Sequence, residues 1–426
     1  YYAASDVTTG TRNVANGGWA LQNLTTGSRN TAMGYNARGY NTTGSENVVV
    51  GYNAGYSGNT GCVTAIGTYA LFSNTAANNT GVGACVLYNN TSATGNTAMG
   101  FKAGFANTVG GNNTAVGHLT LTANVSGNDN VAFGTFAMGS NTNGNCNSAM
   151  GYAALYYNTT GSCNAGLGYK ALYSTTTGNY LTALGVCALY ANTTGNFNTA
   201  VGLNALGANT TGCKNTGMGE GALGSNTTGC HNAAYGRSAL GSNTTANNNT
   251  ASGYHALQSN TTGAGNTAIG DRALTANTTA SSLVAVGQLA MWKTTTGGYN
   301  TTSGYGSLRE NTTGSCNTAH GYKALYANTT AAQNTAYGAF AIYQNTTGQY
   351  NTGLGFQALG STTSGSYNVA IGRNALFCNT TQGVNTAVGY SAAFCNTGHN
   401  ITAVGEGAQG SKGASCYSVA VGNCSN

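Results

Sequence analysis

The sequence predicts an all-β protein, a parallel β-solenoid (β-roll) of about 25 coils, from three observations. A glycine returns every 17 residues, with three intervals of 16, from Gly17 to Gly422. Around it the chain repeats approximately as Asn-Thr-Ala-Val-Gly-Tyr-x-Ala-Leu-x-x-Asn-Thr-Thr-Gly, as in residues 198–212. The composition is also unusual, with 67 Gly, no Pro and only 5% charged residues. A fixed short period gives every copy the same surroundings. The fold is therefore formed by the stack of copies together, and not by a single copy.

The length of the repeat selects strands over helices. Paired-helix repeats need about 33 residues or more, and a unit with two glycines and a Thr-Thr pair would form a poor helix. A coil of this length has room for two or three short strands at about 3.3 Å per residue. We expect strands at Asn-Thr-Ala-Val and at Ala-Leu. Asn-Thr-Thr-Gly is typical of a turn, since Asn and Gly tolerate left-handed backbone angles.

Two aliphatic columns of the repeat are expected to form the core, and two columns of small residues accompany them. Small residues stand two before and three after the glycine, where neighbouring chain must come close. A mostly aliphatic column, the pre-glycine column, stands directly before it: Val50, Ile66, Val116, Leu184, Val201, Ile269, Val388 and Val421. The leucine column stands four after it: Leu155, Leu172, Leu189, Leu206, Leu223, Leu240, Leu257 and Leu274.

The unbroken period predicts one domain, a single repeat array over residues 1–426. No apolar run approaches the roughly 20 residues of a membrane span, so no span is expected in this chain. No cap-like break in the period occurs near either end. We therefore expect the array to be a piece of a longer fibre that continues covalently or by end-to-end stacking.

Several of the 12 cysteines are spaced by one period. Coils stacked at about 4.8 Å would bring such a pair within the disulfide range of about 4.4–6.8 Å between Cα atoms. The predicted bridges are Cys146 with Cys163, Cys213 with Cys230, and Cys378 with Cys395. The alternative is that these cysteines fill a small buried column as weak hydrophobes. The five histidines lie far apart, and no metal site or cofactor is expected.

Asn-x-Ser/Thr sequons recur at one position of the turn, seven residues after the glycine, which we call the sequon column. They are candidates for N-glycosylation, and a glycan coat would keep a nearly uncharged fibre dispersed. The other reading is an unmodified hydrogen-bonded turn. The sequon asparagines are Asn41, Asn90, Asn124, Asn158, Asn192, Asn209, Asn226, Asn243, Asn260, Asn277, Asn311, Asn328, Asn345 and Asn379.

Catalysis and nucleic-acid binding find little support in the sequence. The seven carboxylates each lie in a different copy, so no acid–base pair is indicated and no enzyme is expected. Thirteen Lys and Arg, with a net charge of +6, form no basic stripe for nucleic acid. Tyrosines one and five residues after the glycine could stack on sugars, cover the edge of the core or contact another subunit. They include Tyr152, Tyr156, Tyr169, Tyr173, Tyr322 and Tyr326.

The Asn-Thr-Ala-Val-Gly core resembles the Asn-Ser-Val-Ala-Ile-Gly repeat in the heads of YadA-type trimeric autotransporter adhesins, which form left-handed parallel β-rolls. It also resembles repeat arrays of bacterial, phage and algal-virus fibre proteins. The resemblance covers essentially the whole chain as a low-complexity period. Two features depart from the family: the repeat is longer than its roughly fourteen residues, and residues 1–426 contain no pattern of a neck, stalk or anchor. The resemblance implies a homotrimer of left-handed β-rolls whose small columns let neighbouring coils approach closely. The alternative is a single-chain solenoid, since small columns also occur in the narrow corner of one coil.

These observations predict a structural fibre on a cell surface or virion, such as the shaft of an adhesin or appendage. Its expected partners are further copies of itself, as a homotrimer or an end-to-end fibril, covalent glycans, and a surface or glycan receptor. The alternatives are an ice-binding or carbohydrate-binding solenoid, since flat threonine arrays could match a lattice. A tailspike glycan hydrolase is a third, which would need carboxylates brought together across subunits.

Overall fold

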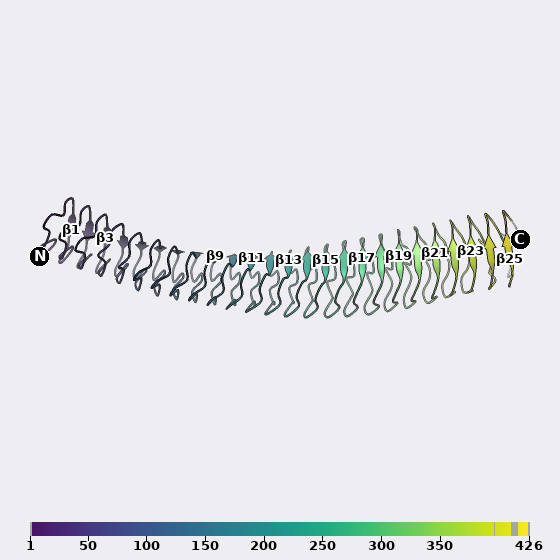
Figure 1. The fold of residues 1–426 in the computed structure, drawn as a ribbon. Helices are drawn as coiled ribbons and strands as arrows, with labels where there is room; N and C mark the ends of the chain where they lie inside the picture. The colour runs from purple at the N-terminus through teal and green to yellow at the C-terminus, as the bar shows by residue number, and fades with distance from the viewer. Residues whose placement is uncertain (1, 396, 410–415, 425–426) are drawn as a thin grey trace. The chain divides into compact units, whose positions relative to one another are not determined.

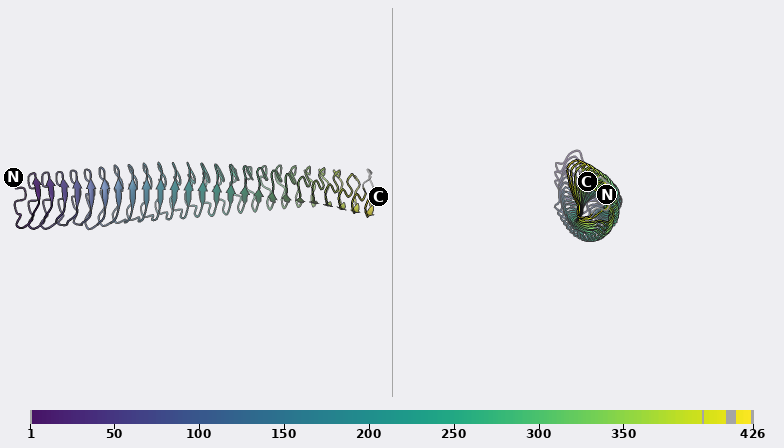
Figure 2. Two further views of the ribbon diagram at one scale, coloured as in Figure 1. Left: turned by 90° about the horizontal axis from the view of Figure 1, so that it is seen from above. Right: turned by 90° about the vertical axis from the view of Figure 1, so that its right-hand side faces the viewer.

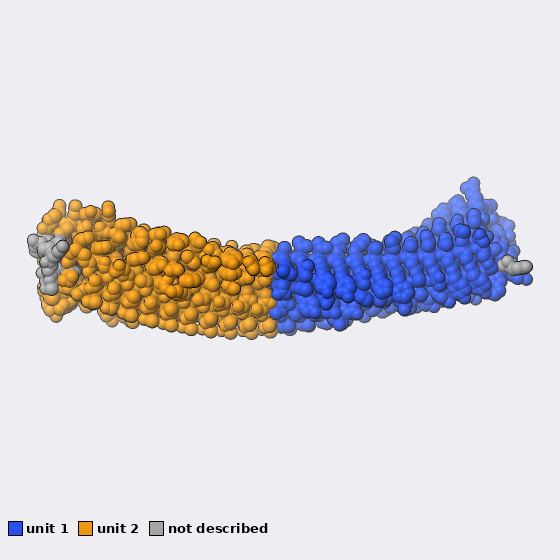
Figure 3. All heavy atoms as spheres, turned by 180° about the vertical axis from the view of Figure 1, so that it is seen from behind, with its two compact units in different colours: residues 1–213 blue, residues 214–426 orange. Residues whose placement is uncertain are grey.

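The computed structural model describes residues 2–395, 397–409 and 416–424, which contain 25 strands of three residues each and no helix. The described residues therefore include no helix that could cross a lipid bilayer. Two compact units make up the chain, Tyr1–Cys213 and Lys214–Asn426 (Figure 3). The single array that the period predicts over 1–426 stays a prediction.

One strand occurs in each coil (Figure 1). Unit 1 contains β1 Val14–Asn16, β2 Thr31–Met33, β3 Val48–Val50, β4 Thr64–Ile66, β5 Thr80–Val82, β6 Thr97–Met99, β7 Thr114–Val116, β8 Val131–Phe133, β9 Ser148–Met150, β10 Ala165–Leu167, β11 Thr182–Leu184 and β12 Thr199–Val201. Unit 2 contains β13 Thr216–Met218, β14 Ala233–Tyr235, β15 Thr250–Ser252, β16 Thr267–Ile269, β17 Val284–Val286, β18 Thr301–Ser303, β19 Thr318–His320, β20 Thr335–Tyr337, β21 Thr352–Leu354, β22 Val369–Ile371, β23 Thr386–Val388, β24 Thr402–Val404 and β25 Val419–Val421.

Within each unit, successive strands pair in parallel and in register. In unit 1, Thr182 pairs with Thr199 and Ala183 with Ala200, so equivalent residues stack. At a short interval the register follows the repeat, since Thr64 pairs with Thr80, 16 residues on. Figure 2 shows the strand arrows side by side along one face of the coils. The predicted parallel β-solenoid with a 17-residue repeat is confirmed; its left-handedness and trimeric state stay predictions.

The prediction of a second strand at Ala-Leu is wrong, because this segment lies in a turn. Leu172 and Leu189 have φ values of 56° and 52°, in the left-handed region that non-glycine residues rarely adopt. The backbone N–H of Leu172 still donates to the carbonyl of Ala188 in the next coil, at 3.0 Å. The leucine column thus keeps its hydrogen bonds between coils while the chain turns sharply.

The repeat glycine is required by both its conformation and its neighbour. Gly168 has a φ of +138°, and a Cβ there would lie 2.4 Å from the carbonyl oxygen of Gly185 in the next coil. A side chain would therefore need a strained backbone and would also collide with stacked main chain. This close approach explains why the glycine returns in every copy.

The core contains one of the two predicted aliphatic columns, together with both columns of small residues. The middle strand residue, such as Ala200, the alanine three after the glycine, such as Ala188, and the leucine column, such as Leu189, are fully buried. The pre-glycine column is the exception, since Leu184 is 44% exposed and Ile269 is 43% exposed. Successive strand residues point to opposite faces. Because the middle residue points inward, the pre-glycine residue must point out, and its assignment to the core is wrong.

Two columns of asparagine complete the interior. One precedes each strand: in unit 1 the backbone N–H of Asn147 donates to the side-chain oxygen of Asn130, and its side-chain amide donates to the carbonyl of Gly161. The other is the sequon column. These amides satisfy backbone groups that the short strands leave unpaired, which lets a narrow coil bury polar main chain.

Candidate functional site

The outer face of the sheet consists of the first and third residues of each strand. None of these positions holds Asp, Glu, Lys or Arg in any of the 25 strands. In unit 1, Met150, Leu167 and Leu184 stand in consecutive coils with exposed fractions of 45%, 46% and 44%. An uncharged row of large apolar side chains on a flat sheet is a feature of interaction surfaces.

The outer face is locally hollowed in unit 1. Leu167 and Leu184 flank a shallow depression of about 210 Å³ over β9 to β11, where the outward position that Thr182 occupies in the next coil holds the smaller Ala165. Threonines occupy most of the first strand positions, including Thr182 and Thr199. The face therefore alternates a polar row and an apolar row.

A second surface carries aromatic residues one, two and five positions after the repeat glycine. In unit 1, Tyr156, Tyr173 and Tyr190 stack in consecutive coils, with ring centroids 5.6 and 5.2 Å apart. Lysines lie among the rings: the ammonium of Lys170 is 5.4 Å from the ring of Tyr169 and 5.1 Å from that of Tyr173. We call this surface the aromatic face, and its cations distinguish it from the outer face.

Lysine recurs on the aromatic face in one arrangement. Lys102 lies between Phe101 and Phe105 as Lys170 lies between Tyr169 and Tyr173. In unit 2, Lys323 has the same relation to Tyr322 and Tyr326. The sequence signal is an aromatic residue, Lys, Ala, one variable residue and a second aromatic residue. Our sequence reasoning noted the tyrosines and missed the lysines.

The sequon column does not lie on an exposed turn, and that part of the glycosylation prediction is wrong. In unit 1, the side-chain amide of Asn209, the nitrogen to which a glycan would be attached, donates to Asn192 at 2.9 Å and to the carbonyl of Gly212 at 3.0 Å. The structure therefore favours the hydrogen-bonded turn. All 14 sequon asparagines have an exposed fraction of 0%: Asn41, Asn90, Asn124, Asn158, Asn192, Asn209, Asn226, Asn243, Asn260, Asn277, Asn311, Asn328, Asn345 and Asn379.

The cysteines predicted to pair lie at equivalent positions of successive coils. Cys146 and Cys163 are exposed, so they do not fill a buried apolar column. Cys378 and Cys395 of unit 2 are partly exposed, as are Cys213 at the end of unit 1 and Cys230 in unit 2. The three disulfides stay predictions.

The acidic residues and histidines do not assemble into a reactive cluster in the described part of the chain. Arg29 pairs with Glu46 of the next coil at 2.6 Å, and Lys293 pairs with Glu310 at 2.5 Å, both at the surface. Among the described residues no group of three or more His, Cys, Asp or Glu could hold a metal ion. The two surfaces described above are thus the features with the potential to bind a partner.

Comparison with models of known protein families gave no match, and neither did a search of curated proteins. The resemblance to adhesin heads and fibre proteins therefore rests on the repeat alone.

Proposed function

We propose that this protein is a structural element of an extracellular fibre, the shaft of an adhesin, appendage or virion fibre, and that it assembles with further copies of itself. Support for the structural role comes from the fold: the described coils repeat one hydrogen-bonded geometry, and their interior is filled by alanine, leucine and asparagine columns. Parallel strand pairing in every coil gives a stiff scaffold.

The observation that carries the self-association is the uncharged outer face. Met150, Leu167 and Leu184 form an apolar row on this face, and each side chain is nearly half exposed. In a monomer this apolar row would stay in water. With about 4.8 Å per coil and a width of about 10 Å, the face of one unit offers roughly 600 Å², the same order as the roughly 800 Å² per partner of a specific interface. A homotrimer would bury this face around one axis.

The test replaces two outer-face leucines with lysine. Leu167→Lys with Leu184→Lys should dissociate the assembly, because desolvating a lysine against an apolar partner is unfavourable. Val186→Lys with Leu203→Lys is the matched control, since Val186 and Leu203 are 46% and 51% exposed but lie just outside the outer face. Sedimentation equilibrium would measure the mass. A monomeric parent, or equal masses for both variants, would count against self-association through this face.

Ice binding is a second candidate, favoured by the threonine row. Thr182 and Thr199 stand at outward strand positions in register, on a sheet face without charge. A regular array of hydroxyl and methyl groups could order water on a lattice. Thermal hysteresis that is lost in Thr182→Lys with Thr199→Lys would support this function, and the absence of thermal hysteresis in the parent would remove it.

A further inference from the structure

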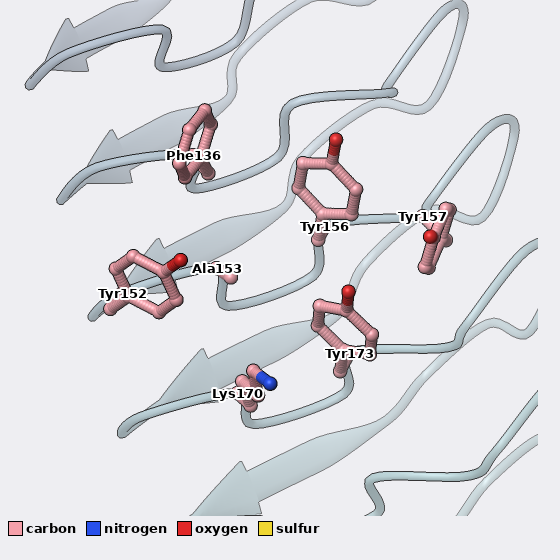
Figure 4. Close-up of a pocket in the computed structure, with 7 residues that line it drawn as sticks. All are labelled: Phe136, Tyr152, Ala153, Tyr156, Tyr157, Lys170 and Tyr173. Atoms are coloured by element: carbon pink, nitrogen blue, oxygen red, sulfur yellow. The ribbon is translucent and has the colours of Figure 1, made fainter.

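A pocket of about 210 Å³ opens on the aromatic face of unit 1. Its lining residues are Phe136, Tyr152, Ala153, Tyr156, Tyr157, Lys170 and Tyr173 (Figure 4). They come from three consecutive coils. Figure 4 shows the rings of Tyr156 and Tyr173 on one side, Tyr152 on the other, and Lys170 below Ala153.

Small residues in the aromatic columns create this pocket. Two positions after the glycine, Ala153 stands between Phe136 of the preceding coil and Lys170 of the following coil, so the column lacks one large side chain. In the column five positions after the glycine, Gly139 lies one coil before Tyr156. A Cβ on Gly139 would lie 2.8 Å from the Tyr156 ring. The gap at Ala153 is therefore walled by rings that their own neighbours hold in place.

The ring contacts fix the walls. Tyr156 and Tyr157 meet edge to face at 4.8 Å, and Tyr157 and Tyr173 do so at 5.2 Å. Phe136 meets Tyr152 at 5.9 Å in the same manner. Edge-to-face and offset contacts at these separations are favourable, so the pocket exists before any ligand enters.

The chemistry of the lining points to an anionic, hydroxyl-rich ligand. Lys170 is its one charged residue, and no carboxylate lines the pocket. The Tyr173 hydroxyl is protonated at neutral pH, and partial burial, followed by a hydrogen bond to Tyr157, raises its pKa further, to about 12. Aromatic faces suit the C–H groups of a sugar ring, while tyrosine hydroxyls and an ammonium suit hydroxyl and carboxylate groups.

We infer that this pocket binds a single acidic pyranose residue, such as a hexuronate, with its carboxylate toward Lys170 and its ring against Tyr152 and Tyr156. The volume admits one sugar ring, which makes the end or a side branch of an acidic polysaccharide the natural ligand. This inference does not depend on self-association, because the aromatic face and the outer face are different surfaces.

A related pocket in unit 2 serves as an internal comparison. Phe340, Tyr343, Gln344, Gln357, Gly360, Ser361 and Phe377 line it, with a volume of about 230 Å³ and no charged residue. It occupies the same columns of the repeat and also depends on a glycine beside an aromatic ring, since a Cβ on Gly360 would lie 2.9 Å from Phe377. It should not distinguish an acidic sugar from a neutral one.

The test is saturation-transfer NMR on the full chain with three probes: sodium glucuronate, methyl glucoside and sodium acetate. Glucuronate should bind at least fivefold more tightly than either the neutral sugar or the acid without a ring. Lys170→Gln should weaken glucuronate binding about tenfold and leave methyl glucoside unchanged, whereas Tyr152→Ala should weaken both sugars about threefold to tenfold. Folding of each variant is checked by its circular dichroism and melting temperature.

Two control variants separate this site from general effects. Lys214→Gln removes the same charge outside the pocket, and Tyr343→Ala opens the uncharged pocket of unit 2, and neither should change glucuronate binding. The inference is overturned if glucuronate does not bind, if it binds no better than acetate, or if Lys170→Gln and Lys214→Gln weaken it equally.

Discussion

The side-chain amide of Asn158 donates to the side-chain oxygen of Asn141, one coil earlier, at 2.7 Å. The same contact joins Asn141 to Asn124 at 2.8 Å and Asn124 to Asn107 at 2.7 Å. In unit 1 the sequon column therefore forms a continuous hydrogen-bonded ladder from Asn107 to Asn158. Ladders of identical amides are a stabilising feature of in-register parallel stacks.

This ladder stops where threonine replaces asparagine, and we predict that Thr175→Asn stabilises the protein. Among the described residues, the side-chain oxygens of Asn158 and Thr175 are buried without a hydrogen-bond partner. An asparagine at 175 could donate to Asn158 and accept from Asn192. The gain should be about 1 kcal/mol, measured by urea unfolding with hydrogen exchange of the neighbouring amides.

The matched change is Asn243→Ala, which breaks an intact part of the ladder. Asn243 donates to Asn226 at 2.8 Å and accepts from Asn260 at 2.9 Å. Its loss should cost about 1–3 kcal/mol, because two buried hydrogen bonds disappear, from Asn243 to Asn226 and from Asn260 to Asn243. A Thr175→Asn variant that exchanges as fast as its parent would show that the ladder break is harmless.

The fold could be predicted from the sequence because the period alone implies stacking, whereas the facing of the side chains could not. Val, Ile and Leu before the glycine look like core, yet residues such as Leu184 point outward because only the middle residue of a three-residue strand faces in. The leucine column was placed in the core correctly but in the wrong backbone conformation. The left-handed φ of Leu172 has no sequence signal, since glycine or asparagine would be expected there.

Pocket and ladder were harder to foresee for a related reason. Asn-Thr-Thr fits equally well an exposed glycosylated turn and a buried amide ladder, and only the stacking decides between them. The pocket on the aromatic face depends on Ala153 lying between Phe136 and Lys170 in space, although each of these two residues is 17 positions from Ala153 in the chain. A single copy of the repeat shows neither relation.

The variants Leu189→Asp and Leu184→Asp should differ in stability, because the first changes a core residue and the second a residue of the outer face. Leu189 has an exposed fraction of 0%, and Leu184 has one of 44%. An aspartate at 189 would place an unpaired charge against the alanine and leucine columns, at a cost of several kcal/mol. In the dissociated single chain the carboxylate at 184 stays in water, and at a protein concentration where the parent is monomeric the change should be under about 1 kcal/mol. Limited proteolysis near the mutated coil measures the difference, and equal digestion rates would refute the assignment of the two faces.

The disulfide prediction has an internal control. Cys146 and Cys163 occupy one position of successive coils, both exposed and with φ values of 55° and 59°. Cys62 and Cys316 occupy the same position in coils whose neighbours have no cysteine there. Peptide mapping of oxidised protein without reduction should recover Cys146 linked to Cys163, and likewise Cys213 to Cys230 and Cys378 to Cys395, while Cys62 and Cys316 react with iodoacetamide. Full alkylation of Cys146 and Cys163 would argue against the bridge.

Arg38 is a buried arginine in the leucine column of unit 1. It is 0% exposed, and its guanidinium extends toward the next coil, where Gly55 stands in place of leucine. It donates to the carbonyl of Thr60 and, at 3.4 Å, to the side-chain oxygen of Asn47. No ion pair with a carboxylate occurs among the described residues, and its Nε has no partner. The hydrogen bonds of Arg38 therefore compensate only part of the cost of burying its positive charge.

We expect Arg38→Met to stabilise the protein by about 1–4 kcal/mol, as when buried charges give way to apolar residues of similar volume. Methionine can fill the space over Gly55. The acceptors also keep other donors, because the side-chain amide of Asn47 donates to Thr60 at 3.1 Å and the backbone N–H of Val63 donates to Asn47 at 3.1 Å. Arg29→Met, which removes an exposed arginine that pairs with Glu46, is the control and should change stability by less than about 1 kcal/mol.

The stability gain of Arg38→Met should depend on pH in a defined direction. Burial lowers the pKa of Arg38 from its ordinary value to about 10, so between about pH 10 and the ordinary pKa of arginine the unfolded chain binds more protons than the folded one. Stability rises with pH wherever the unfolded state binds more protons. The penalty of Arg38 is therefore fully present below about pH 10 and declines above it. Urea unfolding of parent and Arg38→Met should show a constant difference from pH 6 to 9 and a smaller one at pH 11, with tyrosine ionisation common to both. A less stable Arg38→Met would mean that the guanidinium is a net favourable part of the core.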